Sequence, residues 1–297
     1  MRIIMALPVY ATTTQRIGYY TFLTYCGLVF FFLISPIFIV LPLSFSSSPF
    51  FEFTREFMTL DPSGWSLKWY KQMINICGVE VTTVCTDKWM RGTVNSFYIG
   101  IVSTLIATGL GTVAALGLSR PHMPFRALIM AILISPMIVP LIITAAGMFF
   151  FYSKLGLTHS YTGLILAHTA LGTPFVVITV TATLTGFDNN LIRASQSLGG
   201  DTMRTFFKVI MPLILPGVIS GALFAFITSF DEVVVVLFVG SVEQVTIPRQ
   251  MWAGLRQEIS PVILCMATCL VALSIALLTT VELLRRRSER LRGIKNR

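Results

Sequence analysis

The stretch "ASQSLGGDTMRTFFKVIMPLILPG", residues 194–217, lies between two long apolar runs of the chain. It contains a Gly-Gly pair, one acid and two cations, and two prolines open the next apolar run. At its start, Leu191, Ala194 and Leu198 share one face of a helix, at spacings of three and four. The pattern predicts a short amphipathic helix with an exposed apolar stripe, which a partner could cover because water disfavours it.

The Gly-Gly pair predicts where this helix ends. Gly199 and Gly200 favour the left-handed backbone conformation that closes many helices. Asp201 or Thr202 can then cap a second short helix, which we expect to run to about Lys208. The two helices and their turn are called the bracket below, and they cover about residues 186–210.

Composition places the rest of the chain in a membrane. Of its 297 residues, 55% are hydrophobic and only 12% are charged, with a mean hydropathy of +0.80, whereas soluble domains carry about 25% charged residues. A helix needs roughly 20 apolar residues to span a bilayer core. Six uncharged runs are long enough for one span each: 17–51, 92–119, 127–153, 155–187, 209–230 and 259–281. The sequence therefore predicts an all-α integral membrane protein with six transmembrane helices.

Positive charge is distributed unevenly along the chain, whose formal net charge is +9. If the N-terminus is inside, the inner segments hold fourteen of the 22 Lys and Arg residues, as expected for the cytoplasmic side. This predicts a cytoplasmic tail over 1–18, a membrane domain over 19–284 with an outer loop over about 44–93, and a basic cytoplasmic tail over 285–297. Topology and attraction to anionic membrane lipid explain the charge, so nucleic acid is not an expected partner.

The outer loop carries two cysteines and several aromatic residues. Cys77 and Cys85 would face an oxidising compartment, and their spacing permits a disulfide without requiring one. In "PSGWSLKWYKQM", Trp65, Trp69 and Tyr70 alternate with lysines, which is typical of a short helix lying on a membrane surface.

The sequence contains no catalytic or metal-binding constellation. It lacks a CxxC pair, an HExxH, a GxSxG and a Walker-type phosphate loop. The three histidines fall on different segments, and His168 is interpreted either as a packing residue or as part of a polar path. We therefore expect this chain to be no enzyme and to hold neither a metal nor a cofactor of its own.

Two adjacent carboxylates interrupt an apolar segment. They are Asp231 and Glu232 in "FITSFDEVVVVLFVG", and a carboxylate within a membrane is unfavourable by about 2.5–3.5 kcal/mol. Such a group marks either a translocation path or a structural contact, here a helix cap or a salt bridge to Arg249 or Arg256. We favour the path, on which at least one of the two carboxylates would attract a cationic solute.

The bracket also resembles a known motif. "ASQSLGGDTMRTFFKVIMPLILPGV" is similar to the EAA loop of the permeases of ATP-binding-cassette (ABC) importers. The residues that fit are Ala194, Leu198, Gly199, Pro212, Pro216 and Gly217. Downstream, "SFDEVVVVLFVGS", "TIPRQMWAGL" and "ISPVI" resemble spermidine/putrescine-type permeases of the binding-protein-dependent family, and the similarity covers residues 65–281. The chain departs from the motif at Arg193, where a Glu is expected, and at Ser195, which replaces the second Ala.

The resemblance implies a permease subunit of an importer in the bacterial inner membrane, with both termini cytoplasmic. The bracket would be its coupling loop, docked on a cytoplasmic ATPase dimer through Leu191, Arg193, Ala194, Ser195, Leu198, Gly199, Gly200 and Asp201. The ATPase would bind ATP and Mg. A second permease, identical or different, would complete the pore. A periplasmic binding protein would deliver a polyamine-like solute. Arg193 puts in doubt the salt bridge that the motif's Glu makes to the ATPase.

Other classes fit parts of the pattern. A secondary transporter works without an ATPase and often has inverted repeats, but no convincing repeat relates the two halves, and the bracket would be unexplained. A scaffolding membrane protein would leave Asp231 and Glu232 unexplained. Within the importer class, the solute could also be an amino-acid derivative or an opine.

Overall fold

The computed structural model describes residues 10, 12–74, 87–120, 122–188, 190–257 and 260–291. The chain divides into two compact units, the first made of Met1–Met73 and Ser260–Thr279 and the second of Ile74–Ile259 and Thr280–Arg297. Each unit is described by itself below.

Five helices in the described residues are long and apolar enough to cross a membrane. They are α1 (Thr13–Leu43), α4 (Lys88–Leu118), α7 (Tyr161–Thr185), the run Thr202–Phe230, and Val262–Thr279 within α13 (Val262–Leu291). A sixth candidate is the pair α5 (Arg126–Ile138) and α6 (Leu141–Leu155), which is bent by 101°. The predicted all-α membrane fold is confirmed, and the count reaches six when the bent pair is taken as one span.

The third predicted span, residues 127–153, is broken into α5 and α6 and is not one continuous helix. Val139, between α5 and α6, has an extended backbone with φ −69° and ψ 135°. Pro140 follows it, has no backbone N–H, and disfavours a helical conformation in the residue before it. Pro136 lies inside α5 without ending it, so only one of the two prolines breaks the span.

In the first unit, the residues after α1 form a small folded loop. It contains α2 (Arg55–Met58), the 3-10 turn η1 (Pro62–Gly64) and α3 (Lys68–Met73). Trp69 is buried, and its indole Nε1 donates a hydrogen bond to the carbonyl of Ser46 at 3.0 Å. The short helix α3 agrees with the sequence, but Trp69 stabilises the loop from within instead of anchoring it in a membrane surface.

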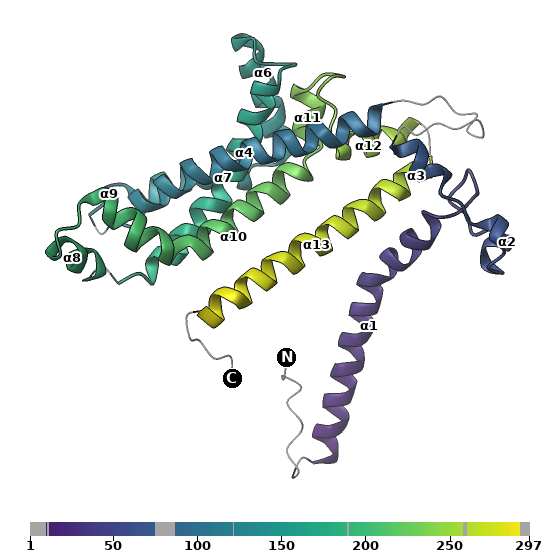
Figure 1. The fold of residues 1–297 in the computed structure, drawn as a ribbon, viewed down its shortest axis with the longest axis horizontal. Coiled ribbons are helices and arrows are strands. Elements are labelled where there is room, and N and C mark those ends of the chain that lie inside the picture. Colours follow the sequence, from purple (N-terminus) through teal and green to yellow (C-terminus); the bar gives the residue numbers. More distant parts are fainter. Residues whose placement is uncertain are drawn as a thin grey trace. The chain divides into compact units, whose positions relative to one another are not determined.

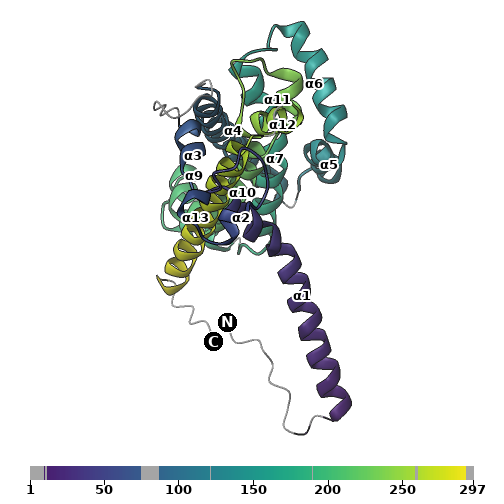
Figure 2. The same cartoon turned by 90° about the vertical axis from the view of Figure 1, so that its right-hand side faces the viewer.

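The centre of the second unit is a bundle of α4, α7 and α10 (Met211–Phe230), which lie side by side (Figures 1 and 2). Small residues allow α7 and α10 to approach closely. A Cβ atom added to Gly221 of α10 would lie 2.8 Å from the Cα atom of Val176 on α7. On the same face of α10, a Cβ at Gly217 would lie 2.9 Å from the Cβ of Thr183. This spacing of small residues is typical of packing between membrane helices.

The bundle ends differently on its two sides. The helices α8 (Asn190–Ser197) and α9 (Thr202–Thr205) lie at one end, and α11 (Val234–Val239) and α12 (Ile247–Gln257) at the other (Figure 1). The six-residue α11 packs against α6 and α7, where Leu164, Val235 and Val236 are fully buried in one hydrophobic core.

Candidate functional site

The bracket begins with α8 and turns at its two glycines. Gly199 has a φ of +81°, the left-handed conformation that glycine adopts without strain. The backbone N–H of Gly200 donates to the carbonyl of Ser195 at 2.9 Å and closes the helix. The carboxylate of Asp201 then accepts a hydrogen bond from the backbone N–H of Arg204 at 2.7 Å. The predicted turn and the predicted Asp201 cap are therefore confirmed.

The second arm of the bracket is not the separate short helix that we expected. From α9 the chain continues through η2 (Phe206–Ile210), a π-turn, directly into α10, so that Thr202–Phe230 is one helical run of 29 residues. Pro212 lies just after the π-turn, and prolines and π-turns are both places where the backbone hydrogen-bond pattern of a helix changes locally. The bracket is thus joined to a membrane-spanning helix without a break.

The first arm, α8, has two different faces. Leu191, Ala194 and Leu198 are exposed, as predicted, and Leu198 is 90% exposed. Ile192 and Gln196 point the other way and line a cavity. The outward face therefore keeps an apolar stripe that no described residue covers.

The two positions at which the bracket departs from the motif behave differently. Ser195 forms a hydrogen bond between its Oγ atom and Oγ1 of Thr205 at 2.8 Å, which joins the two arms. A Cβ added to Gly200 would lie 2.6 Å from the same Oγ, so the turn packs tightly on Ser195. Arg193 is exposed and has no carboxylate partner within the described ranges.

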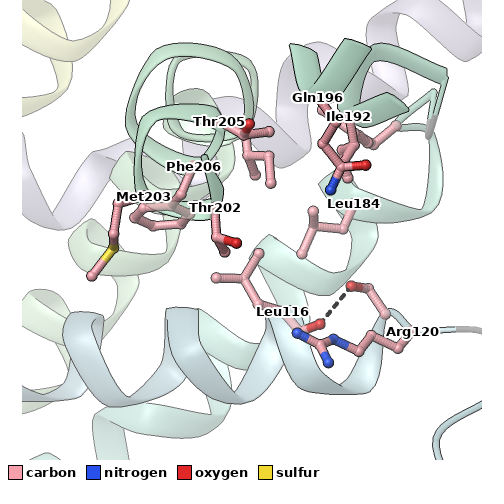
Figure 3. A pocket seen from close by; sticks show the side chains of 12 residues that line it. Leu116, Arg120, Leu184, Ile192, Gln196, Thr202, Met203, Thr205 and Phe206 are labelled. Carbon is pink, nitrogen blue, oxygen red and sulfur yellow. Dashed lines mark hydrogen bonds between the residues drawn. The ribbon is translucent and has the colours of Figure 1, made fainter. Parts of the chain in front are cut away.

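A cavity of about 450 Å³ lies between the bracket and the bundle (Figure 3). Leu116 and Arg120 at the end of α4 form one side of it, together with Leu184 near the end of α7. Gln196 of α8 and Thr202 of α9 face them across the cavity.

The two carboxylates lie at the opposite end of α10 from the bracket. Asp231 caps the C-terminus of α10 and is exposed. Glu232 is buried, and its Oε1 atom accepts a hydrogen bond from the backbone N–H of Val235 at 2.7 Å. The structure therefore shows the capping alternative for Glu232, whereas a role of Asp231 on a translocation path stays a prediction.

Neither carboxylate forms the salt bridge that we considered as an alternative. In the described part of the chain, the ion pair that occurs is Arg91 with Asp87, at 2.6 Å. Arg249 instead donates from Nη1 to the carbonyl of Ser241 at 2.6 Å.

A hydrogen-bond network near the carboxylates was not predicted. Asn95 of α4 donates from Nδ2 to the carbonyls of Glu243 and Val245, both at 2.8 Å. Its Oδ1 atom accepts from the hydroxyl of Tyr161 at 2.9 Å. The network ties the segment before α12 to α4 and α7. The sequence signal was the Asn-Ser pair in "VNSFYIG", because Asn is rare within an apolar span.

His168 is fully buried in the bundle. Its Nδ1 atom lies 2.7 Å from Oγ of Ser229, which in turn contacts Oγ of Ser103 at 3.1 Å. These contacts connect α7, α10 and α4 and agree with the packing interpretation of the histidine.

Two further predictions concern metal ions and the disulfide. Among the described residues, no group of three or more His, Cys, Asp or Glu side chains could hold a metal ion. Cys77 and Cys85 lie outside the described residues.

A bundle of apolar spans with a bracket between two of them is the architecture of a multi-span membrane protein. Residues 107–290 match the family described as the binding-protein-dependent transport system inner membrane component. The chain belongs to this family, and it is a multi-pass protein of the inner membrane.

The chain is also similar to individual members of such systems. It is 27% identical over 237 residues to the spermidine/putrescine transport system permease protein PotC of Haemophilus influenzae, with 80% of this chain and 88% of that protein covered. It is 26% identical over 253 residues to the putrescine transport system permease protein PotI of Escherichia coli K12, with 82% of each covered. Its fold is similar to that of a chain in the crystal structure of a bacterial ABC transporter involved in the import of the acidic polysaccharide alginate. The TM-score is 0.69 and the identity 15%, and the match covers 94% of this chain and 99% of that chain.

Proposed function

We propose that the chain is the permease subunit of an ABC importer and that its bracket docks on a partner ATPase. The observation that carries this proposal is the exposed stripe of Leu191, Ala194 and Leu198, held on a short helix at the end of a span. A partner that covers the stripe gains the free energy of removing apolar surface from water, about 25 cal/mol per Å².

The continuous helix gives the docked bracket a mechanical role. The hydrogen bond between Ser195 and Thr205 joins α8 to α9, and α9 continues without a break into α10. A displacement of α8 by the ATPase would therefore move α10 and, through their close packing, α7. This chain contributes the moving helices, and the ATPase dimer would bind ATP and Mg.

The remaining partners and the orientation follow from the family and from the charge distribution. A periplasmic binding protein would deliver the solute, and a second permease, identical or different, would complete the pore. The cation excess supports an orientation in which the bracket and both termini are cytoplasmic and the outer loop is outside. Membrane lipid surrounds the exposed apolar side chains of α1, which is almost unburied.

The solute that we propose is a polyamine-like cation. The names of PotC and PotI support this class, although both are only about a quarter identical to this chain. Asp231 adds an exposed carboxylate at the end of α10 far from the bracket, where it would attract ammonium groups. Amino-acid derivatives and opines remain the alternative solutes, and uptake of labelled spermidine into proteoliposomes, with these compounds as competitors, distinguishes them.

The docking assignment is tested with a pair of matched variants. Leu198→Asp places a charge on the stripe, and Met58→Asp places one on the outer loop, where Met58 is 72% exposed. Loss of a central apolar contact weakens an interface by about 2 kcal/mol or more, roughly thirtyfold in affinity. We expect co-purification of the ATPase to fail with Leu198→Asp and to persist with Met58→Asp. Equal co-purification with both variants would show that the bracket does not dock.

A further inference from the structure

The cavity between the bracket and the bundle has the lining of a site for an amphipathic anion. Most of its lining side chains are apolar, among them Leu116, Leu184 and Phe206. Arg120 is the charged residue in the lining, which contains no carboxylate. Arg120 is exposed and has no carboxylate partner in the part of the chain that the structure describes. A ligand with an apolar chain and a negative headgroup satisfies both parts of this lining.

The place of the cavity in the fold indicates where such a ligand comes from. Leu116 lies in the last turn of α4, which ends at Leu118, and Leu184 lies in the last turn of α7, which ends at Thr185. The ends of membrane spans lie near the boundary between hydrocarbon and headgroups. Basic pockets between spans at this level, on the cytoplasmic side, bind anionic lipid headgroups.

A protein side chain fits this cavity less well than a lipid. The exposed stripe to which we assign docking is on the opposite face of α8 from Ile192 and Gln196, which line the cavity. The volume of about 450 Å³ falls within the roughly 300–1,000 Å³ of pockets that hold whole small ligands. A bilayer supplies both the acyl chain and the phosphate at this depth.

We infer that the cavity binds an anionic phospholipid, with an acyl chain inside and the headgroup phosphate at Arg120. The lipid would contact the ends of α4 and α7 through Leu116 and Leu184, and α8 through Ile192. It would therefore brace the bracket against the bundle. This regulatory consequence rests on the proposed function, whereas lipid binding itself does not.

The experiment measures lipids retained by the purified full-length chain, using native mass spectrometry after exchange into detergent with phosphatidylglycerol or phosphatidylcholine. Arg120→Gln removes the charge at the cavity. Arg126→Gln removes an exposed charge that opens the neighbouring helix α5 and does not line the cavity, so it controls for general attraction to anionic lipid. Leu184→Phe fills the cavity without changing the charge. Thermal unfolding in lipid-free detergent shows that each variant is folded.

We expect the unchanged chain to retain phosphatidylglycerol about tenfold better than phosphatidylcholine, because the choline cation offsets the attraction between its phosphate and Arg120, whereas phosphatidylglycerol keeps a net negative charge. Arg120→Gln should bring the ratio close to one, Arg126→Gln should leave it within twofold, and Leu184→Phe should lower the retention of both lipids. Equal retention of the two lipids by the unchanged chain, or equal effects of the two arginine variants, would overturn the inference.

A parallel measurement of ATPase co-purification separates this inference from the proposed function. If Leu184→Phe keeps phosphatidylglycerol but loses the ATPase, the cavity receives a protein side chain and the lipid assignment is wrong. If the lipid results are as expected while the ATPase never co-purifies, the lipid site stands and the docking proposal fails.

Discussion

The close packing of α7 on α10 leads to a quantitative prediction at Gly221. In Gly221→Ala, the new methyl carbon would lie 2.8 Å from the Cα atom of Val176, and van der Waals contact is ordinarily reached at 3.4–4 Å. The methyl carbon would lie even closer to Oγ1 of Thr179, which is on a side chain. The Cα atom of Val176 belongs to the backbone, so it cannot rotate away as the end of a side chain could. The two helices must separate locally, and the neighbouring contact at Gly217 would be loosened with them.

The magnitude follows from two opposing terms. Overpacking of a tight contact costs about 1–3 kcal/mol, while replacing glycine by alanine within a helix gains about 0.8–1 kcal/mol. Gly109 on α4 is a matched control, because a Cβ atom there meets nothing within 4 Å. Gly109→Ala keeps the gain without the clash, so the difference between the two variants isolates the packing term of about 1–3 kcal/mol.

The assay is thermal unfolding of the purified chain in detergent. The quantity measured is the fraction of the chain that stays monodisperse after heating to each temperature. A difference of about 2 kcal/mol corresponds to roughly 4–8 °C in midpoint for a chain of this size class. We expect Gly221→Ala to unfold at the lower temperature by this amount. If Gly221→Ala and Gly109→Ala unfold within 1 °C of each other, the helices are not packed as closely as the structure shows.

Four further predictions concern the bracket, the far end of the bundle and the outer loop. Ser195→Ala removes one hydrogen bond between the arms, worth about 1 kcal/mol. We expect the amount of solute transported per ATP hydrolysed to fall several-fold, while ATPase co-purification persists. An unchanged ratio of solute to ATP would show that this bond has no mechanical role. Asn95→Ala removes the hydrogen bonds that Asn95 donates to the carbonyls of Glu243 and Val245, although the hydroxyl of Tyr161 can still donate to the carbonyl of Glu243 at 3.3 Å. The unfolding midpoint should therefore drop by the equivalent of about 1–3 kcal/mol, the cost of an unpaired buried polar group, and an unchanged midpoint would refute the network. Asp231→Asn should lower spermidine uptake per assembled complex and leave assembly itself unchanged. If this variant takes up spermidine at the wild-type rate, Asp231 does not lie on the translocation path. A thiol reagent applied outside the membrane should label Cys77 and Cys85, after reduction if they are bridged. Labelling of either cysteine only by a reagent applied from the cytoplasmic side would show that the predicted topology is wrong.

The turn of the bracket could be predicted because its causes are local. Gly199 adopts a positive φ that only glycine takes easily, and Asp201 caps the next helix through a residue three positions away. Both effects act within a few residues, so the sequence pattern contains them completely. The outward direction of Leu191 and Leu198 also follows from helical periodicity alone.

The breaks in the helices could not be predicted, because prolines have different outcomes that depend on their surroundings. Pro174 lies inside α7 and Pro216 inside α10, and neither interrupts its helix, whereas Pro140 separates α5 from α6 with a bend of 101°. The bent arrangement is stabilised where α6 packs against α11, a contact between segments about ninety residues apart in the sequence. Sequence periodicity contains no information about such a contact.

Asp231 and Glu232 show the same limit at the level of single side chains. The sequence places them as one acidic pair in an apolar segment, and their cost in a membrane argued that at least one of them lies on the solute path. The structure ends α10 at Phe230 and starts α11 at Val234, so the two residues occupy a break with free backbone N–H groups. Glu232 turns inward and satisfies one of these donors, while Asp231 stays exposed. A buried carboxylate that caps a helix is already partnered and has little to offer a passing cation, so the electrostatic argument for a cationic solute now rests on Asp231 alone.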